Sequence, residues 1–264
     1  MRVLISNDDG IDAAGIWAIA QEAANRGHQT IVVCPARQQS GMSHALSVGH
    51  PLEVKKIHRE DKIETWTIDG TPTDCVKIYL ESMCDWHLQR EHSQKFNREI
   101  PYKYERDPMP DAVISGINHG PNLATDVLYS GTVGAALEGY LHELPSLAVS
   151  LETNSKLTYE TAAKIAVDFF EDSLKKSTTP FFYNMNLPRE LKDDQPEIKF
   201  TRLGRRDYVN AFKKITDETG RTFFQIQGES YDTDESEGTD LYAVHRGFIS
   251  VTPLQVDLSD YKKI

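Results

Sequence analysis

The sequence predicts an α/β fold with a mostly parallel central sheet, followed by a β-rich C-terminal extension. Two observations support this fold class. Short apolar runs that are typical of buried strands alternate with helical patterns over residues 1–196. From about Glu197, strand-like runs separated by turns follow one another, and no helix is expected before the extreme C-terminus. The intervening helices of the first part supply the crossovers that parallel strands need.

The clearest unit is a strand, a helix and a second strand at the start of the chain. The run RVLIS at residues 2–6 predicts a buried strand, and QTIVVC at residues 29–34 predicts another. Between them, Asp12 is expected to cap a helix that ends near Asn25, with Gly27 as its terminator. Elements of these lengths make a right-handed βαβ unit, which implies a parallel pair of strands.

The later elements follow from similar patterns. LEVKKI at residues 52–57 and IETWTI at residues 63–68 alternate, and predict a hairpin or an extension of the sheet. Thr71 and Pro72 predict the start of a helix. Residues from about 84 to 110 are polar, charged and aperiodic, and predict a surface insertion. The other expected elements are strands at 111–116, 144–151, 181–188, 198–204, 221–229 and 247–255, and helices at 130–143 and 159–174.

Composition and charge argue against several classes of protein. The formal net charge is −11, whereas a protein that binds nucleic acid polymers through the phosphate backbone is normally basic. No apolar run approaches the roughly 20 residues of a membrane span. No secretory signal is recognised, so we expect a cytoplasmic protein. Cys34, Cys75 and Cys84 form no CxxC pair or zinc-like spacing, and we expect free, buried thiols.

Polar clusters fall where the predicted strands end. The run NDDG at residues 7–10 follows the first strand, and the pair Ser40-Gly41 lies in the loop after the second. The run SGINHG at residues 115–120 follows a third strand, and SGT at residues 130–132 opens a helix. In open parallel sheets, ligands bind at the carboxyl ends of the strands. These clusters therefore mark the expected site.

The acidic pair in the first cluster predicts a metal site. Asp8 and Asp9 carry adjacent like charges, and a shared cation relieves their repulsion. Asn118 can add a neutral carbonyl oxygen and Ser40 a hydroxyl. Hard oxygen ligands without Cys or His suit Mg²⁺, Mn²⁺ or Ca²⁺ and not zinc. The alternative interpretation is ordinary turn chemistry, in which the aspartates only cap the first helix.

The segment Ser130-Gly131-Thr132 predicts a phosphate site. It precedes an Ala- and Val-rich helix, whose free backbone N–H groups and dipole attract anions. Gly131 lets the backbone come close to a ligand. The alternative is a plain helix cap with a glycine in the turn.

Histidines and a further acidic run are weaker signals. His119 lies inside the third cluster, where it can donate a proton or contact phosphate, and His44 lies near Ser40. Either residue can equally be a polar loop residue without a chemical role. The run from Asp232 to Asp240 predicts a solvated acidic loop, with a second metal site as the alternative.

Several familiar motifs are missing from the sequence. It has no GxxxxGK[ST] phosphate loop, no GxGxxG after the first strand and no GxSxG elbow. A phosphatase of the haloacid dehalogenase type needs two aspartates separated by one residue, but Gly10 occupies the second of these positions.

The motifs together resemble the SurE family of survival-protein nucleotidases. The resemblance is carried by SNDDG, RQQSG, GTPTDCV, SGINHGPN and YSGTVGAALEG. The runs LPSLAVSL, NMNLP, TDLYAV and GFISVTPLQ extend it through the C-terminal part. It covers nearly the whole chain apart from the insertion at about 84–110.

The resemblance implies a metal-dependent phosphatase that acts on nucleoside monophosphates at the 5′ or 3′ position. It implies a Rossmann-like core over residues 1–196 and a C-terminal region over residues 197–264 that supports a homodimer or homotetramer through an exchanged arm. The family's metal ligands map onto Asp8, Asp9, Ser40 and Asn118. Its phosphate-binding segments map onto Asn122, Ser130, Gly131 and Thr132, and we add Gly41 and His119 as candidates for substrate contact.

The expected mechanism is attack on the phosphomonoester by water activated by one Mg²⁺ or Mn²⁺ ion per subunit. Asp8 and Asp9 are the expected catalytic residues, and the backbone amides of Gly131 and Thr132 would stabilise the developing charge. A covalent aspartyl-phosphate on Asp8 is the alternative chemistry. The alternative function is a regulatory module that binds a metal–nucleotide without turnover. The sequence predicts neither the preferred nucleotide nor the general acid.

Overall fold

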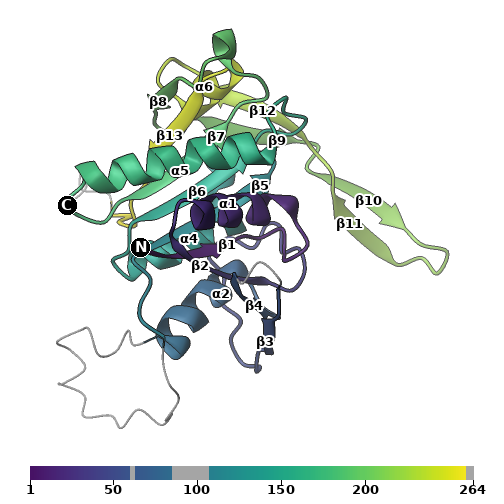
Figure 1. The fold of residues 1–264 in the computed structure, drawn as a ribbon. Helices are drawn as coiled ribbons and strands as arrows, with labels where there is room; N and C mark the ends of the chain where they lie inside the picture. The colour runs from purple at the N-terminus through teal and green to yellow at the C-terminus, as the bar shows by residue number, and fades with distance from the viewer. Residues whose placement is uncertain (60–62, 85–106, 260–264) are drawn as a thin grey trace.

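The computed structural model describes residues 1–59, 63–84 and 107–259, which form a nine-stranded sheet with helices on both faces (Figure 1). The expected insertion at about 84–110 lies mostly outside these residues. The strands of the sheet are β1 (Arg2–Ser6), β2 (Gln29–Pro35), β3 (Val54–Ile57), β4 (Glu64–Ile68), β5 (Ala112–His119), β6 (Ser146–Leu151), β7 (Phe182–Leu187), β8 (Ile198–Phe200) and β13 (Ile249–Pro253). Their order is β3-β4-β2-β1-β5-β6-β7-β13-β8.

The middle of the sheet is parallel, as predicted. β1 pairs in parallel with β2 on one side and with β5 on the other, so that Leu4 lies opposite both Ile31 and Val113. From β1 the chain first builds outward through β2, and it later builds in the other direction through β5, β6 and β7. The topological switch point therefore lies between β1 and β5, and a crevice at the carboxyl ends of these strands is the expected ligand site.

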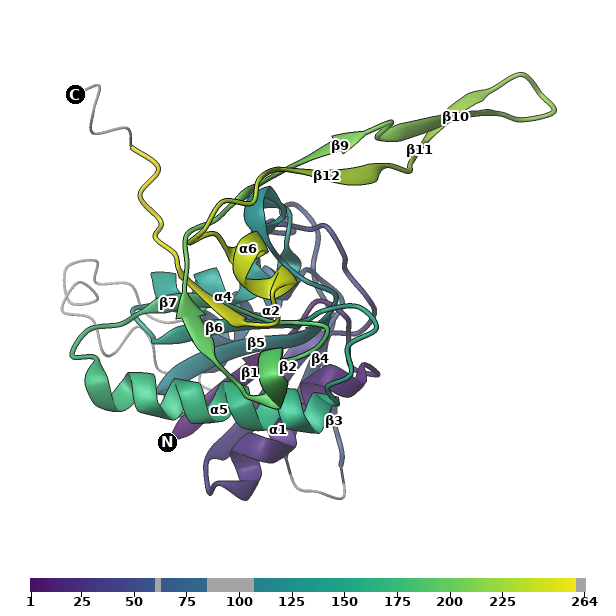
Figure 2. The same ribbon diagram turned by 90° about the horizontal axis from the view of Figure 1, so that it is seen from above.

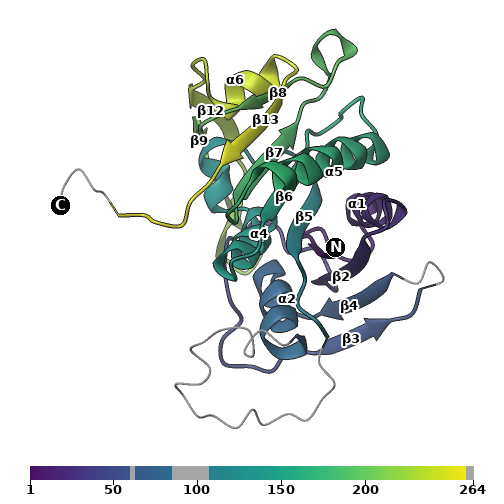
Figure 3. The ribbon, with the colours of Figure 1, turned by 60° about the vertical axis from the view of Figure 1, so that its left-hand side comes forward.

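Helices cover both faces of this sheet. They are α1 (Ala14–Asn25), α2 (Pro72–Ile78), α4 (Gly131–Leu141), α5 (Tyr159–Lys176) and α6 (Asp240–His245), with the short helices η1 (Tyr79–Met83), η3 (Ala124–Leu128) and η4 (Lys192–Asp194). α1 and α5 pack together on one face, and α2 and α4 pack together on the other (Figure 3). Ile16, Ile19 and Phe170 are buried on the first face, and Val76 and Tyr79 on the second.

The helix starts show which local signals matter. Thr71 caps α2 as predicted, because its hydroxyl accepts from the Asp74 N–H at 3.1 Å and the Asp74 carboxylate accepts from the Thr71 N–H at 2.9 Å. The predicted cap of α1 by Asp12 was wrong. The N-cap residue is Ala13, with no side-chain cap. Its N–H donates to the Gly10 carbonyl at 3.3 Å, so a backbone turn leads directly into the helix.

The C-terminal part contributes to the sheet and also leaves it. β8 and β13 extend the main sheet, with β13 antiparallel to β7. β9 (Arg205–Val209) pairs with β12 (Glu229–Asp234), and β10 (Phe212–Thr216) pairs with β11 (Thr222–Ile226). These four strands form a long arm that projects from the body (Figure 2). Two expectations are corrected here. β12 extends into the predicted acidic loop and covers its residues 232–234, and α6 is a helix within the region where none was predicted.

The described residues also bear on compartment and thiol chemistry. No helix among them combines the length and apolar character that a bilayer crossing requires. Cys34, Cys75 and Cys84 are free and buried, as expected.

We predict that Gly15→Ala destabilises the fold, because a Cβ at this position would lie 2.0 Å from the carbonyl oxygen of Ile117 in β5. Backbone atoms cannot move aside as a flexible side chain can. The free energy of unfolding in urea should fall by about 1–3 kcal/mol, the usual penalty for overpacking. Ala14→Ser, on an exposed position of the same helix, is the control. Equal midpoints for the two variants would contradict this account of how α1 packs on β5.

Candidate functional site

A closed turn holds the two carboxylates at the end of β1. The Asn7 side-chain nitrogen donates to the Gly10 carbonyl at 2.9 Å, and the Asn7 side-chain oxygen accepts from the Gly10 N–H at 3.2 Å. Both hydrogen bonds are buried. Because the turn closes on itself, Asp8 and Asp9 stay at the switch point and are not drawn into α1.

Asp8 packs directly against the N-terminus of α4. Its Oδ1 accepts a hydrogen bond from the Thr132 hydroxyl at 2.5 Å, and its side chain is buried. A Cβ on Gly131 would lie 2.9 Å from the Asp8 Cβ and 3.0 Å from its Oδ2. Only glycine leaves room for this contact. The Asp8 carbonyl also accepts from the Gln39 N–H at 2.7 Å, which ties the turn to the loop that carries Ser40.

Asp9 connects two other parts of the site. Its Oδ2 accepts from the His119 N–H at 2.9 Å, at the carboxyl end of β5. Its Oδ1 lies 3.4 Å from the side-chain nitrogen of Gln38, which also donates to the Ser40 hydroxyl at 3.0 Å. The Gln38 amide thus bridges the carboxylate of Asp9 and the hydroxyl of Ser40.

Asn118 sits where the pairing of β5 with β6 changes register. The shift falls between Ser115 and Asn118, at the carboxyl end of β5. The Asn118 amide nitrogen donates to the Gly120 carbonyl at 2.8 Å, which leaves the amide oxygen for another partner. The structure therefore gathers Asp8, Asp9, Ser40, Asn118, His119, Gly131 and Thr132 around one switch point.

Two residues of this site were missed by the sequence analysis. Asn7 shapes the acidic turn, and Gln38 links Asp9 to Ser40. The signal for Asn7 is its place in an Asn-x-x-Gly turn. Gln38 lies in the quoted RQQSG motif, but nothing in a single sequence distinguishes it from Gln39.

The other residues predicted for phosphate or substrate binding, Asn122, Ser130 and Gly41, lie in different surroundings. Asn122 is buried, and its side-chain nitrogen donates to the Ser150 hydroxyl at 2.8 Å, so its role in phosphate binding stays a prediction. The Ser130 hydroxyl accepts from the Val133 N–H at 3.1 Å and caps α4. Gly41 is exposed beside Ser40, with open space around its Cβ position.

The His119 ring is exposed and contacts a second element. Its Nδ1 lies 3.1 Å from the Tyr159 hydroxyl, at the first residue of α5. Burial, with a smaller contribution from Asp9, raises the pKa of Tyr159, so this hydroxyl stays protonated and can serve as a donor. The ring of His119 is therefore held at the rim of the site, while its backbone N–H serves Asp9.

The electrostatics of the site favour a cation. The pKa of Asp8 is raised from 3.8 to about 6, mainly by burial. The charge of Asp9 also acts to raise this pKa, and the hydrogen bond from the Thr132 hydroxyl acts to lower it. Within the described ranges, neither aspartate forms an ion pair with a lysine or an arginine. Two adjacent carboxylates without a cationic partner, beside hydroxyl and amide oxygens, fit a hard divalent cation.

Two other groups of acidic and histidine side chains come close to one another. They are Glu81, Glu138 and His142, and Asp232, Glu235 and His245. Lys77 lies within the first group and donates to Glu81 at 2.7 Å and to Glu138 at 3.0 Å. Arg206 donates to Asp232 of the second group at 2.6 Å. Because basic side chains already neutralise them, we interpret both groups as ion-pair networks.

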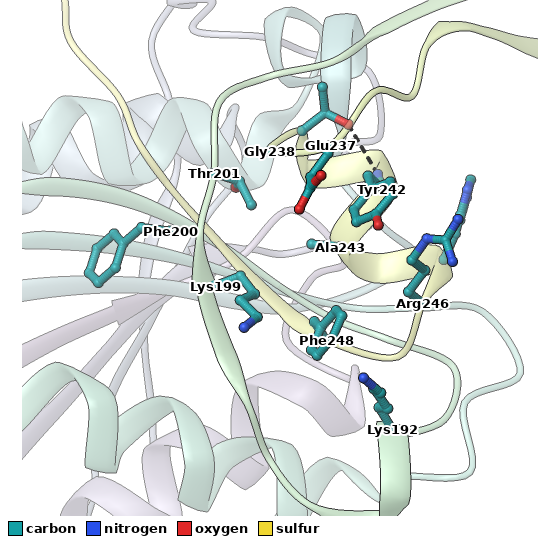
Figure 4. A pocket seen from close by; sticks show the side chains of 12 residues that line it. Lys192, Lys199, Phe200, Thr201, Glu237, Gly238, Tyr242, Ala243, Arg246 and Phe248 are labelled. Atoms are coloured by element: carbon teal, nitrogen blue, oxygen red, sulfur yellow. Dashed lines mark hydrogen bonds between the residues drawn. The ribbon is translucent and has the colours of Figure 1, made fainter.

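A surface hollow of about 690 Å³ lies elsewhere, between β8, η4 and α6 (Figure 4). Lys192 and Lys199 place their ammonium groups 4.7 and 4.8 Å from the centre of the Phe248 ring. None of the residues predicted for the metal and phosphate sites lines this hollow, although Glu237, Gly238 and Thr239 of the predicted acidic run do. It belongs to the far edge of the sheet, away from the switch point between β1 and β5.

Comparison with known proteins identifies a family. A family model described as "Survival protein SurE" matches residues 3–210. The chain is 38% identical over 272 residues to "5'-nucleotidase SurE" of a Synechococcus elongatus strain, covering 100% of this chain and 97% of the relative. It is 41% identical over 266 residues to "5'-nucleotidase SurE" of Desulforamulus reducens, covering 99% and 95%.

A solved structure shows the same fold. The crystal structure of the SurE protein from Aquifex aeolicus superposes with a TM-score of 0.75 and 35% sequence identity. The match covers 99% of this chain and 96% of the other. The predicted α/β class with its C-terminal extension is therefore confirmed.

The raised pKa of Asp8 predicts a pH dependence for the metal-free protein. Because that pKa is 3.8 in its ordinary state and about 6 here, the folded state holds this proton more tightly than the unfolded chain. The contribution of Asp8 to the free energy of unfolding therefore increases as the pH falls from about 6 toward 3.8. Thr132→Val removes the donor to the carboxylate, so the pKa of Asp8 should rise further. A titration followed by the ¹³C shift of the Asp8 carboxyl group measures this change.

Thr30→Val, in the buried strand β2, is the control for that titration, since its hydroxyl does not contact Asp8. An Asp8 pKa that stays the same in Thr132→Val would show that the hydroxyl does not stabilise the charged carboxylate.

Proposed function

This chain belongs to the SurE family, and on that basis we propose that it is a metal-dependent 5′-nucleotidase that hydrolyses nucleoside monophosphates. One observation carries the proposal beyond the family assignment. The buried Asp8 carboxylate, next to Asp9 and without a basic partner among the described residues, touches the N-terminus of α4 at the switch point. A cation site and an anion site are thus adjacent, which is what a phosphate ester bound through a metal ion requires.

The proposed metal ligands are the side-chain oxygens of Asp8, Asp9, Ser40 and Asn118. The donor set fits Mg²⁺ or Mn²⁺, because it contains two carboxylates, a hydroxyl and an amide oxygen and no sulfur or imidazole. A divalent cation held by these oxygens would acidify an attacking water and screen the charge on the phosphoryl oxygens. Proton binding at Asp8 competes with this cation, because both need the same carboxylate.

The proposed phosphate site is the N-terminus of α4. The backbone N–H groups of Gly131 and Thr132 have no partner within the helix, and the helix dipole adds a partial positive charge. They would stabilise the charge that develops on the phosphoryl oxygens. Ser130 fixes this turn through its cap on Val133. Asn122, Gly41 and His119 are proposed as further contacts to the substrate.

The residues around the attacking water would position it and not bond to phosphorus. Asp9 is oriented by the His119 N–H and by Gln38, so it can accept a hydrogen bond from water in a fixed direction. Asp8 packs against Gly131 and accepts a hydrogen bond from Thr132. These contacts support a role for Asp8 as a metal ligand and not as a nucleophile toward phosphorus. Trapping a phosphoenzyme on Asp8 would instead establish the covalent route.

The partners and compartment that we propose follow from the same features. The substrate is a small nucleotide and not a nucleic acid polymer or a membrane, which agrees with the net charge of −11. The free buried thiols fit the reducing cytoplasm.

The arm of β9 to β12 is proposed to join subunits into a homodimer or homotetramer. In the register of β10 and β11, Phe212 lies opposite Ile226 and Lys214 lies opposite Phe224. Cross-strand partners share a face, so three large apolar side chains lie on one face of the hairpin. Phe212, Phe224 and Ile226 are 62%, 67% and 81% exposed. Such a face is unfavourable in water unless another copy covers it.

The first experiment is phosphate release from a panel of 5′- and 3′-nucleoside monophosphates with Mg²⁺, with Mn²⁺ and with excess chelator. We expect release from the 5′-nucleotides only when metal is present. The panel also ranks the bases and tests the 3′ position. Affinity for nucleotides without release under any metal would instead support a binding module.

Asp8→Asn should reduce metal-dependent turnover by about 10² or more, since it removes one ligand charge at the reacting centre. The fold should survive because Asn has the same shape and can still accept from Thr132. Asp12→Asn, on the exposed part of the same loop, is the matched control. A near-normal rate in Asp8→Asn would contradict the proposed role.

Replacing Phe212, Phe224 and Ile226 together by serine should dissociate the oligomer, because these residues are the most exposed large apolar side chains of the β10–β11 hairpin. Light scattering after size-exclusion chromatography measures the mass. The control replaces Lys213 and Gln225, which face each other on the opposite side of the hairpin. An unchanged mass in the triple variant, or a monomeric wild type, would refute this assembly.

A further inference from the structure

The loop that carries Ser40 depends on a few anchors for its position. Residues 36–53, between β2 and β3, contain no helix or strand and are largely exposed. A side chain on such a loop is held in place only where the loop is bonded to something rigid. The proposed metal ligand Ser40 therefore depends on contacts made by its neighbours in the loop.

The first anchor joins the loop to the segment that precedes Ser130. The Ser43 N–H donates to the Tyr129 carbonyl at 3.0 Å, and the Ser43 hydroxyl donates to the Leu128 carbonyl at 2.7 Å. The loop also lies flat against α4 here, because a Cβ on Gly134 would come within 2.3 Å of the Ser43 carbonyl oxygen. The loop and the start of α4 thus share a tight contact outside the site itself.

The second anchor is a hydrogen bond between His44 and a buried carboxylate. The Nε2 of His44 lies 2.7 Å from the Oε2 of Glu138, a residue of α4 that is only 2% exposed. The other carboxylate oxygen accepts from the Lys77 ammonium at 3.0 Å. Lys77 also donates to Glu81 at 2.7 Å, so α2 and η1 join the same network.

The burial of Glu138 makes this anchor strong. Burial acts to raise the pKa of Glu138, but hydrogen bonds from His44 and Lys77 keep it below its ordinary value. The carboxylate is therefore ionised and needs both donors. Removing a hydrogen-bond donor from a buried carboxylate is far more costly than removing one from an exposed carboxylate, because the buried charge loses part of its compensation. His44 cannot swing away from α4 without that penalty, and the loop is held with it.

We infer that Glu138 is a positioning residue for the proposed reaction, acting through His44 on the loop that carries Ser40. The inference rests on the proposed function. One rigid helix, α4, carries Thr132 against Asp8 near its N-terminus and Glu138 against His44 farther along. The Glu138–His44 pair therefore sets the distance between the Ser40 loop and the phosphate-binding end of α4. The network of Glu81, Glu138 and His142 is thus a support for the metal site and not a second one.

The test measures Mn²⁺ binding by calorimetry, and the dependence of phosphate release on Mn²⁺, in the full-length protein. His44→Leu should weaken Mn²⁺ binding about tenfold or more, the usual effect of losing a residue that orients a metal ligand. The Mn²⁺ concentration that gives half of the maximal rate should rise. The maximal rate at saturating Mn²⁺ should change by a smaller factor. His44→Gln keeps an N–H donor for Glu138 and should restore most of the affinity.

His50→Leu is the matched control, because His50 is an exposed histidine of the same loop and bonds to no other described residue. It should leave Mn²⁺ binding and the rate unchanged. A thermal melt of each variant shows whether a loss reflects unfolding. If His44→Leu and His44→Gln lose activity only in proportion to the unfolded fraction, the role of the pair is merely structural and the inference is overturned.

The outcomes separate this inference from the proposed function. If the wild type binds Mn²⁺ but releases no phosphate from any nucleotide, the proposed function fails, and the binding series still decides the positioning role. If the wild type is active and His44→Leu matches it in Mn²⁺ affinity, the positioning role fails alone. A wild type that binds no Mn²⁺ would overturn both.

Discussion

Burial of the Asp8 carboxylate against the N-terminus of α4 is the constraint on which the rest of the structure depends. A buried carboxylate next to a second one is unfavourable, and its pKa of about 6 reflects this. The Thr132 hydroxyl and the N-terminal dipole of α4 offset part of the penalty. The contact requires a glycine at position 131. It also requires the first residues of α4 to lie in space beside the carboxyl end of β1. The order of the strands around β1 and β5 provides that meeting point.

On the proposed function, the same charges explain why the site needs a cation to hold its substrate. A phosphate monoester is an anion, and it approaches a chain of net charge −11 through a site that holds two carboxylates. The α4 N-terminus alone supplies about half a unit of positive charge, which does not outweigh Asp8 and Asp9. A divalent cation reverses the sign of the local field, and the helix then adds to the attraction. The metal dependence proposed for this chain thus follows from the charge balance at the switch point.

Much of the core was predictable from the sequence because its elements have simple periodic signals. The apolar strands β1, β2 and β5 and the amphipathic helix α5 follow directly from these patterns. Asp12 was assigned as a cap because its residue type is typical of caps, but the backbone of Gly10 satisfies the start of α1. Local residue preference was overridden there by the geometry of the acidic turn.

The C-terminal part was less predictable for a physical reason. β12 is rich in acidic residues, and its strand conformation depends on pairing with β9, which a single sequence does not reveal. The helix α6 is too short to show a helical period. Gln38 was missed because its importance arises from its two partners, Asp9 and Ser40, which lie on different segments.

The C-terminal part is also tied to the proposed phosphate site. η3 directly precedes Ser130, and residues of the tail hold it in place. The Asp240 carboxylate accepts from the Ala124 N–H at 2.7 Å and from the Gly204 N–H at 2.8 Å. In the middle of η3, the Asp126 carboxylate accepts from the Arg206 guanidinium at 3.1 Å.

These contacts connect the arm to the short helix η3. Arg206 belongs to β9, at the base of the arm, and also pairs with Asp232 of β12. The base of the arm is therefore hydrogen-bonded directly to η3. Because η3 leads into the cap of α4, this short helix joins the base of the arm to the turn that carries the proposed phosphate site. The extension that looks peripheral in the sequence is part of the support for the site.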